Sequence, residues 1–516
     1  MRDTPRLWCV FALVLLAGSV QAQDAPPKMV REYWDAAYLE GAKSGHFHTL
    51  IVETERDGKK LFITTHAISL KVKRGGETVE MKMEDGVEET PEGKVVSVST
   101  TMYTGAAKLT VTGRVEGDKL VIRGAGGREL KRLTWDANAL GPYAQDRVWK
   151  EKKLKPGARF EFTNFELDIE KAFKISISVK EMEETIVLEA KKADPKAKAE
   201  YVKRTLLRAE AVPDKVEVGG AILQLPKVVS WLDGDANIVR AETRLPGLGR
   251  IIAYRTTKAI ATEEGAAPDT LPDLMLTTLI PINKPIDRPY ERTEVVYRIT
   301  MTDDDDPKSA FALSARQSIE NVKGNVFELR VQAQRAFAQV ERPEKVSDDY
   351  RGANHFLDSA DETVKALAAR AVGTEKEPWA KAKRIETWVH QNMKGTSTEV
   401  FPTASQIARN LKGDCRQHAL LTAAMCRAVG LPSRTALGLV YTVDRQKGPV
   451  FAFHMWTEVY IVDQWMSLDA TLGIGGVGPT HLKVGDQSWH DVQTMAPLLS
   501  VLRVLDKIKV EVVAVK

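Results

Sequence analysis

The stretch of sequence that decides the fold of this chain reads Leu-Lys-Gly-Asp-Cys-Arg-Gln-His-Ala-Leu-Leu over residues 411–421. Gly413 and Asp414 interrupt the preceding pattern, and the Asp414 side chain is suited to cap the N-terminus of a helix. A helix is therefore predicted from Cys415 to about Val429, where a Gly-Leu-Pro sequence ends it. Cys415 would lie in the first helical turn. There the helix dipole favours a thiolate, and backbone N–H groups are free to bind an oxyanion.

Two side chains that could assist a cysteine nucleophile follow downstream. His454 lies 39 residues after Cys415, at the head of a predicted strand that includes Trp456. Asp469 lies 15 residues after His454, at the end of the next predicted strand, and the turn between these strands is predicted at residues 462–464. Such a hairpin places His454 and Asp469 on neighbouring strands, although the sequence leaves the register open. We expect His454 to act as base and acid toward Cys415, and Asp469 to orient the imidazole.

The pattern formed by these motifs resembles the core of the transglutaminase-like superfamily, whose members are papain-like cysteine enzymes. The matching segments are 413–421, 427–434, 454–460 and 465–469. In that family the cysteine heads a helix packed on an antiparallel sheet, and the sheet carries the histidine and the aspartate. The resemblance covers about residues 375–480 and implies a catalytic triad of Cys415, His454 and Asp469 in an exported, bacterial-type member. Met455 is a departure, because the family usually has a small residue between the histidine and the tryptophan.

The resemblance also implies a chemistry. Members of the family crosslink proteins, hydrolyse peptides, deamidate side chains or cleave glycan amides, all through a thioester made by attack of the cysteine on an amide or peptide carbonyl. The predicted function is a cysteine peptidase, amidase or glutamine acyltransferase with a protein or peptide substrate and no cofactor. Hydrolysis is favoured over transfer, because nothing in the sequence marks a site for a lysine donor. The alternative is a non-catalytic binding or assembly protein with a vestigial transglutaminase-like domain, and the intact triad argues against it.

The fold class predicted for the whole chain is α+β, with a large antiparallel β-rich region before the transglutaminase-like domain. The length of 516 residues suggests three or four domains at roughly 100–200 residues each. Runs of β-branched residues alternate with turn signals such as Arg74-Gly75-Gly76, which is typical of an antiparallel sheet. The predicted divisions are a β-rich domain at 32–140, a second one or a continuation at 141–265, a β-rich connecting segment at 270–345 and the catalytic domain at 346–516. Whether residues 32–265 form one β region or two sheets in series is left open.

The N-terminus indicates export. Arg2 and Arg6 lead into an apolar run at 7–17, and the small residues at 18–22 suit a signal peptidase. Residues 1–22 therefore predict a secretory signal peptide cleaved after Ala22, and a periplasmic or secreted mature chain; an uncleaved N-terminal anchor is the alternative. No other run of about 18 apolar residues, the length needed to span a membrane, appears in the sequence. The 74 basic and 70 acidic residues give a formal charge of +4, too slight to favour a nucleic acid as partner.

The cysteine content favours a chemical role for one thiol. Of the three cysteines, Cys9 would leave with the signal peptide. Cys415 and Cys426 lie eleven residues apart on one predicted helix, about 16 Å at the helical rise, which is beyond disulfide reach. Exported proteins usually pair their cysteines or omit them, so unpaired thiols call for a reason. We assign Cys415 to catalysis and Cys426, in the middle of the helix, to the core.

Three further histidines have plainer interpretations. His418 follows Cys415 by three residues and is predicted to lie on a helix face, with a second role in the site as the alternative. His481 and His490 are predicted to be surface or structural residues.

Metal sites are not predicted. His46 and His48 would point to the same side of a strand, as a pair of metal ligands does, but no further ligands cluster with them in the sequence. The acidic run Asp303–Asp306 is predicted as a solvated turn, because its spacing matches no calcium-binding loop.

Overall fold

The computed structural model describes residues 26–104, 107–124, 127–152, 154–190, 199–218, 221–264, 270–302, 304, 306–334, 337, 346–395, 402–490 and 499–516. The predicted signal peptide at 1–22 and its Cys9 lie outside the described residues, as do Asp303 and Asp305 of the acidic run. Within the described ranges, no helix is both long enough and apolar enough to cross a membrane.

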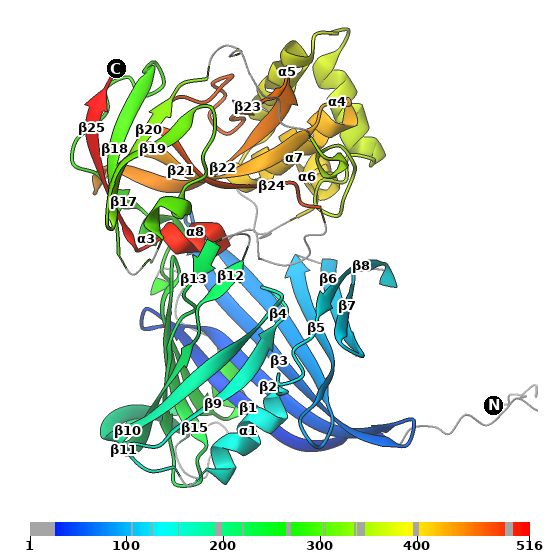
Figure 1. Cartoon of the computed structure of the whole chain (residues 1–516), viewed down its shortest axis with the longest axis vertical. Helices are drawn as coiled ribbons and strands as arrows, with labels where there is room; N and C mark the ends of the chain where they lie inside the picture. The colour runs from blue at the N-terminus through cyan, green and yellow to red at the C-terminus, as the bar shows by residue number, and fades with distance from the viewer. Residues whose placement is uncertain are drawn as a thin grey trace, which may run out of the picture.

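The N-terminal part is one antiparallel sheet of fourteen strands in the order β8-β7-β6-β5-β4-β3-β2-β1-β16-β15-β14-β11-β10-β9. The strands are β1 (Lys28–Leu39), β2 (Ala42–Arg56), β3 (Lys59–Arg74), β4 (Glu77–Glu89), β5 (Val95–Thr104), β6 (Ala107–Glu116), β7 (Lys119–Arg123), β8 (Glu129–Thr134), β9 (Arg159–Glu166), β10 (Lys171–Ala190), β11 (Ala199–Pro213), β14 (Val228–Leu232), β15 (Ile238–Leu245) and β16 (Gly249–Thr256). Alternate residues face inward, and Leu109 and Val111 of β6 are accordingly both buried. Figure 1 shows how strongly this sheet curves below the C-terminal part.

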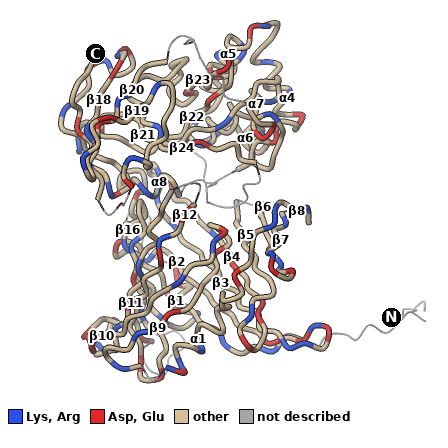
Figure 2. Tube along the Cα trace, in the orientation of Figure 1, with Lys and Arg blue, Asp and Glu red and all other residues tan. Residues whose placement is uncertain are grey.

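The two predicted β-rich segments meet at β1 and β16. These strands pair antiparallel from Trp34 opposite Thr256 to Leu39 opposite Ile251. Residues 32–140 and 141–265 therefore contribute strands to a single sheet, which is one of the two arrangements that the sequence left open. Its smaller additions are α1 (Pro142–Glu151), α2 (Lys258–Thr262) and the pair β12 (Val216–Val218) and β13 (Ala221–Leu223). Basic and acidic residues are interspersed over both parts of the molecule, as the near-neutral charge balance suggests (Figure 2).

The C-terminal part combines two smaller antiparallel sheets with a group of helices (Figure 1). One sheet has the order β17-β22-β21-β24, with β23 paired to β22, and the other has the order β19-β20-β18-β25. The strands are β17 (Ile280–Pro281), β18 (Glu294–Met301), β19 (Gln317–Lys323), β20 (Val326–Gln332), β21 (Ser433–Asp444), β22 (Gly448–Ile461), β23 (Gln464–Leu468), β24 (His481–Gln487) and β25 (Ile508–Val515). The helices are α3 (Leu274–Thr277), α4 (Glu362–Val372), α5 (Pro378–Asn392), α6 (Ala404–Asn410), α7 (Cys415–Ala428) and α8 (Leu499–Val504), with 3₁₀ turns at Pro307–Ala310 and Asp348–Tyr350.

The segment predicted as a connector shares a sheet and a core with the C-terminus. Tyr297 and Ile299 of β18 lie opposite Val512 and Val510 of β25, which are more than 200 residues away in the chain. These residues belong to the same buried cluster as Leu420 of α7. The strands between residues 294 and 332 therefore support the part of the molecule that carries Cys415.

Helix α7 is the buried centre of the C-terminal part. It packs against α4, α5 and α6 and against β21 and β22. The helix begins at the predicted Cys415 and ends at Ala428, one residue before the predicted end. Gly430 follows with a φ of +82°. The N–H of Leu431 donates to the carbonyl oxygen of Cys426 at 2.9 Å and so caps the C-terminus of the helix. The Gly-Leu-Pro signal thus stops the helix where the sequence indicates.

Candidate active site

A capping box places Cys415 at the first position of α7. The Asp414 carboxylate accepts the backbone N–H of Arg416 at 2.9 Å, and the Gln417 side chain accepts the N–H of Asp414 at 3.0 Å. Gly413 precedes the cap with a φ of +155°, and a Cβ there would lie 2.3 Å from the Cβ of Gln417. Only glycine lets the chain approach the helix this closely, so Gly413 sets where the thiol lies.

The strand register brings His454 to the same site. His454 lies on β22 opposite Gly438 of β21. A Cβ on Gly438 would meet the carbonyl oxygen of Leu482 at 2.0 Å and the Trp456 ring at 3.0 Å. The missing side chain therefore allows β21 and β24 to approach closely beside the histidine.

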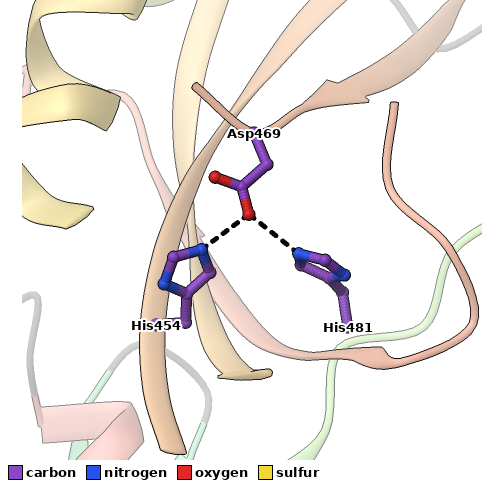
Figure 3. Close-up of side chains that lie close together, drawn as sticks. All are labelled: His454, Asp469 and His481. Atoms are coloured by element: carbon purple, nitrogen blue, oxygen red, sulfur yellow. Dashed lines mark hydrogen bonds and ion pairs between the residues drawn. The ribbon is translucent and has the colours of Figure 1, made fainter. Parts of the chain in front are cut away.

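A tight turn then returns the chain past His454. Val462 and Asp463 have φ values of +48° and +59°, as a two-residue hairpin turn of type I′ requires. The last pair of the β22–β23 ladder is Thr457 opposite Leu468, so Asp469 emerges directly beyond the ladder. Its Oδ2 lies 2.7 Å from Nε2 of His454 (Figure 3).

Four hydrogen bonds hold the Asp469 carboxylate, which is fully buried. Oδ1 accepts the backbone N–H groups of Thr471 at 2.9 Å and Leu472 at 3.2 Å. Oδ2 accepts from His454 and, at 2.9 Å, from Nε2 of His481 (Figure 3). Burial disfavours the charged carboxylate, yet His454 and His481 hold the pKa of Asp469 well below its ordinary value. Asp469 is therefore a fixed, ionised acceptor.

Helix α5 supports the loop that carries Asp469. The carbonyl oxygen of Ala470 lies 3.1 Å from Nδ1 of His390, and the Glu386 carboxylate accepts the N–H of Gly475 at 3.0 Å. These contacts join the loop after β23 to a helix that is distant in sequence, and they restrict the direction in which Asp469 points.

The electrostatics favour a protonated His454. Burial disfavours the imidazolium, but the charge of Asp469 and the hydrogen bonds with Asp469 and Cys415 outweigh it and raise the pKa of His454 to about 10. Since Nε2 faces Asp469, the other ring nitrogen remains for the sulfur. The structure thus brings Cys415, His454 and Asp469 together, in the order that the sequence predicts.

His481 is the residue at this site that sequence reasoning missed. The sequence predicts a surface or structural residue; His481 is fully buried, which rules out the surface position, and it donates to Asp469. It reaches the site because β24 pairs with β21, where His481 lies opposite Val440. No local signal in the sequence predicts this pairing, since strand order is a tertiary property. Burial outweighs the attraction of Asp469 and lowers the pKa of His481 to about 4, so the ring is neutral at pH 7.

The donor atoms of His454, Asp469 and His481 all lie within 4.8 Å of one another, which is a spacing that a metal ion could use. In the structure both histidines instead hydrogen-bond the same carboxylate oxygen, Oδ2 of Asp469. A cation would have to replace both hydrogen bonds. The arrangement therefore suits a proton-transfer site whose carboxylate has two imidazole partners.

His418, His46, His48 and His490 lie in ordinary environments. His418 hydrogen-bonds the Asp414 carbonyl oxygen through Nδ1 at 2.8 Å, so it stabilises the start of α7. His48 stacks on Trp34 at a ring distance of 3.9 Å, and His46 lies 5.6 Å from the same ring. His490 is exposed. Cys426 is fully buried, and burial raises the pKa of its thiol to about 12.

A pair of substitutions at His481 tests its link to Asp469. His481→Leu removes one of the four hydrogen bonds to the Asp469 carboxylate, and we expect it to slow alkylation of Cys415 about tenfold, because a hydrogen bond to a charged group contributes about 1.5–3 kcal/mol and its loss leaves the carboxylate less firmly oriented. His481→Gln retains an N–H donor and should stay within about threefold of the unchanged protein. The measurement is the rate of iodoacetamide labelling, with His490→Gln as the control. Equal rates for the leucine and unchanged proteins would show that His481 only fills space.

Comparison with known proteins identifies the domain around this site. Residues 365–470 match the family model of the transglutaminase-like superfamily. The chain therefore contains a transglutaminase-like domain, and its fold is α+β with a large antiparallel β-rich region before that domain. This confirms the resemblance seen in the sequence. No curated protein matches the chain.

Solved structures with similarity to the chain include three with low identity. A candidate cysteine protease from Cytophaga hutchinsonii is 18% identical with a TM-score of 0.28, over 38% of this chain and 80% of that one. A β-barrel-like protein of a domain of unknown function from Brucella abortus is 11% identical with a TM-score of 0.29, over 43% of this chain and 94% of that one. A candidate protease from Parabacteroides distasonis is 11% identical with a TM-score of 0.18, over 80% of this chain and 70% of that one.

Proposed function

With residues 365–470 matching the transglutaminase-like superfamily, we propose that this protein is an exported cysteine enzyme that attacks an amide or peptide carbonyl through Cys415, His454 and Asp469. The observation that carries the proposal is the buried chain of contacts from the Cys415 thiol through the His454 ring to the Asp469 carboxylate. Such a chain activates a sulfur nucleophile and holds the base in one orientation.

The proposed reaction has two stages. In the first, the Cys415 sulfur attacks the carbonyl carbon, and the Cys415 backbone N–H at the start of α7 stabilises the developing oxyanion. The carbon–nitrogen bond breaks as His454 gives its proton to the leaving amine, which leaves a thioester. In the second, His454 takes a proton from water, the hydroxide attacks the thioester, and the thiolate is released. If an amine replaces water, the same thioester yields a new amide, and the enzyme is a transferase.

Asp469 has a supporting role in this scheme. Its carboxylate stabilises the imidazolium that forms when His454 is protonated, and its pKa below the ordinary range keeps it from taking the proton itself. The two backbone N–H groups and His481 fix its orientation.

A second candidate function is a binding or assembly protein with a vestigial domain. The size of the fourteen-stranded sheet is the observation that favours it, since the proposed chemistry needs no such surface. The two functions predict different reactivities for the Cys415 thiol.

Thiol labelling separates these functions. In the enzyme, Cys415 should react with iodoacetamide at neutral pH, whereas Cys426 should not, because it is fully buried and its pKa is raised to about 12. His454→Ala removes the imidazolium partner and should slow labelling of Cys415 about tenfold or more. Cys426→Ala is the matched control and should label as fast as the unchanged protein. If His454→Ala also labels as fast as the unchanged protein, the binding function is favoured.

The reaction type can be read by mass spectrometry of exported proteins incubated with the unchanged chain. New peptide ends would identify a peptidase, glutamine converted to glutamate a deamidase, and lysine–glutamine isopeptides a transglutaminase. The same mixture incubated with Cys415→Ala gives the background. The absence of any difference between the two samples would remove the support for a protein substrate.

A further inference from the structure

The N-terminal sheet reaches the helix cap that carries the nucleophile. Arg74, the last residue of β3, lies 340 residues before Asp414 in the chain. Its Nε donates to Oδ2 of Asp414 at 2.6 Å, and the two side chains are only 20% and 18% exposed. Asp414 is the residue immediately before Cys415, so this ion pair joins the sheet to the candidate active site.

The hairpin that presents Arg74 is itself held in place. Gly75 and Gly76 form the turn between β3 and β4 with φ values of +60° and +86°, which fits a type I′ turn. Their N–H groups donate to the two carboxylate oxygens of Asp273 at 3.0 and 2.8 Å, and the N–H of Lys73 donates to the carbonyl oxygen of Pro272 at 3.2 Å. Arg74 is therefore presented from an anchored turn, which lowers the entropy cost of its ion pair.

Arg74 offsets the negative charge that Asp414 brings close to the Cys415 sulfur. The carboxylate caps α7 well, but a negative charge beside Cys415 opposes formation of a thiolate. Arg416 neutralises it from within the helix, with Nη2 at 3.0 Å from Oδ2. Arg74 adds a second cation, so that the three side chains together carry a net positive charge next to the sulfur. Burial lowers the pKa of Arg74, but the charges of Asp414 and Cys415 outweigh it and raise that pKa.

The other ionisable groups around this cluster do not replace Arg74. His418 lies on α7 and is held to the Asp414 carbonyl oxygen, and burial lowers its pKa. His454 approaches the sulfur from β22 and Asp469 lies behind it. Asp273 faces Arg74 from the segment before α3 and adds negative charge.

We propose that Arg74 is a positioning residue of the active site, through which the N-terminal sheet fixes the capping carboxylate and favours the reactive thiolate of Cys415. This inference rests on the proposed function, because it assigns Arg74 a role in the reactivity of that cysteine. It also gives the β-rich region a part in the chemistry, because Arg74 comes from β3 of that region.

The test uses the full chain with Arg74→Gln, Arg74→Lys and Arg56→Gln. Arg56 is the matched control, because it makes a two-point ion pair with Glu88 at 2.8 and 3.0 Å within the same sheet. The readouts are the iodoacetamide labelling rate of Cys415 as a function of pH and the thermal unfolding of each variant. We expect Arg74→Gln to label about three- to tenfold more slowly at neutral pH, with the rate profile moved to higher pH. Arg74→Lys should restore most of the rate, and Arg56→Gln should match the unchanged protein.

Two results would overturn the inference. One is an Arg74→Gln profile that coincides with that of the unchanged protein. The other is an Arg74→Gln chain that loses its fold while Arg56→Gln keeps it, because the ion pair would then be a structural support. If Cys415 of the unchanged protein reacts no faster than a cysteine in a short peptide, the proposed function itself fails. A reactive Cys415 that is insensitive to Arg74 refutes this inference alone.

Discussion

Replacing Cys415 by alanine should lower the rate of product formation by about 10⁴-fold or more, because the alanine has no atom that can form the thioester. The loss should appear in the maximal rate rather than in the affinity for substrate, since the carbonyl can still occupy the site. The measurement is the yield over time of whichever cleaved, deamidated or crosslinked products the unchanged protein generates.

Two comparisons make this result specific to the nucleophile. Cys426→Ala changes a cysteine on the same helix that is fully buried, and it should retain the unchanged rate apart from a modest loss of stability. Cys415→Ser keeps a hydroxyl of similar size, but serine is a far weaker nucleophile in a site built for a thiolate, so its rate should also fall steeply. Product formation by Cys415→Ala at a rate near that of the unchanged protein would rule out a thioester mechanism.

Replacing Glu458 by glutamine should destabilise the C-terminal part by about 3 kcal/mol, because two buried cations are then left with one partly exposed carboxylate as their counter-charge. Glu458 lies on β22, four residues after His454, and is 3% exposed. Its Oε2 accepts from Arg434 at 2.8 Å and from Lys483 at 2.7 Å. Asp486 contacts the same two cations but is partly exposed, so it compensates for only part of the lost charge. Urea unfolding at pH 7 measures the difference.

The matched control for this change is Glu320→Gln, which removes an exposed partner of Arg330 and should alter stability by about 1 kcal/mol or less. If the two variants unfold at the same urea concentration, the buried cluster contributes no more than a surface pair.

The folding stability of the unchanged protein should depend on pH through the cluster of Glu458, Arg434 and Lys483. Burial disfavours the Glu458 carboxylate, but Lys483 and Arg434 outweigh it and lower its pKa to about 2. A carboxyl whose folded pKa lies below its unfolded value of about 4.3 contributes stability above that unfolded value. The contribution is then lost as the pH falls from about 4.3 to about 2. The Glu458→Gln variant lacks this contribution, so the stability difference between it and the unchanged protein should shrink over that interval.

Local signals in the sequence account for the elements around the site. Gly413 and Asp414 predict the start of α7, and Gly430 predicts its end, because capping and left-handed glycine conformations depend on a few neighbouring residues. The turn after β22 is found at Val462 and Asp463, within the predicted residues. Hydrogen bonds and steric limits within a few residues decide such features, so a single sequence contains the information for them.

Long-range pairing could not be predicted in the same way. Nothing near His481 indicates that β24 lies beside β21, and nothing near β25 indicates that it pairs with β18. The pairing of β1 with β16 is also not indicated by nearby residues, because many strands of similar apolar pattern could pair with the same edge.

By itself, the sequence predicted Cys415, His454 and Asp469 as the site residues and determined the start of the helix at the cysteine, and its resemblance to a known domain type over about 375–480 is confirmed by the match at 365–470. Only the tertiary structure decided that His481 is the second partner of Asp469 and that Arg74 reaches the cap of α7 from the N-terminal sheet. The physical reason is that residue types and local backbone preferences are properties of short segments. Which surfaces meet depends instead on the burial of apolar area and the pairing of charges over the whole chain.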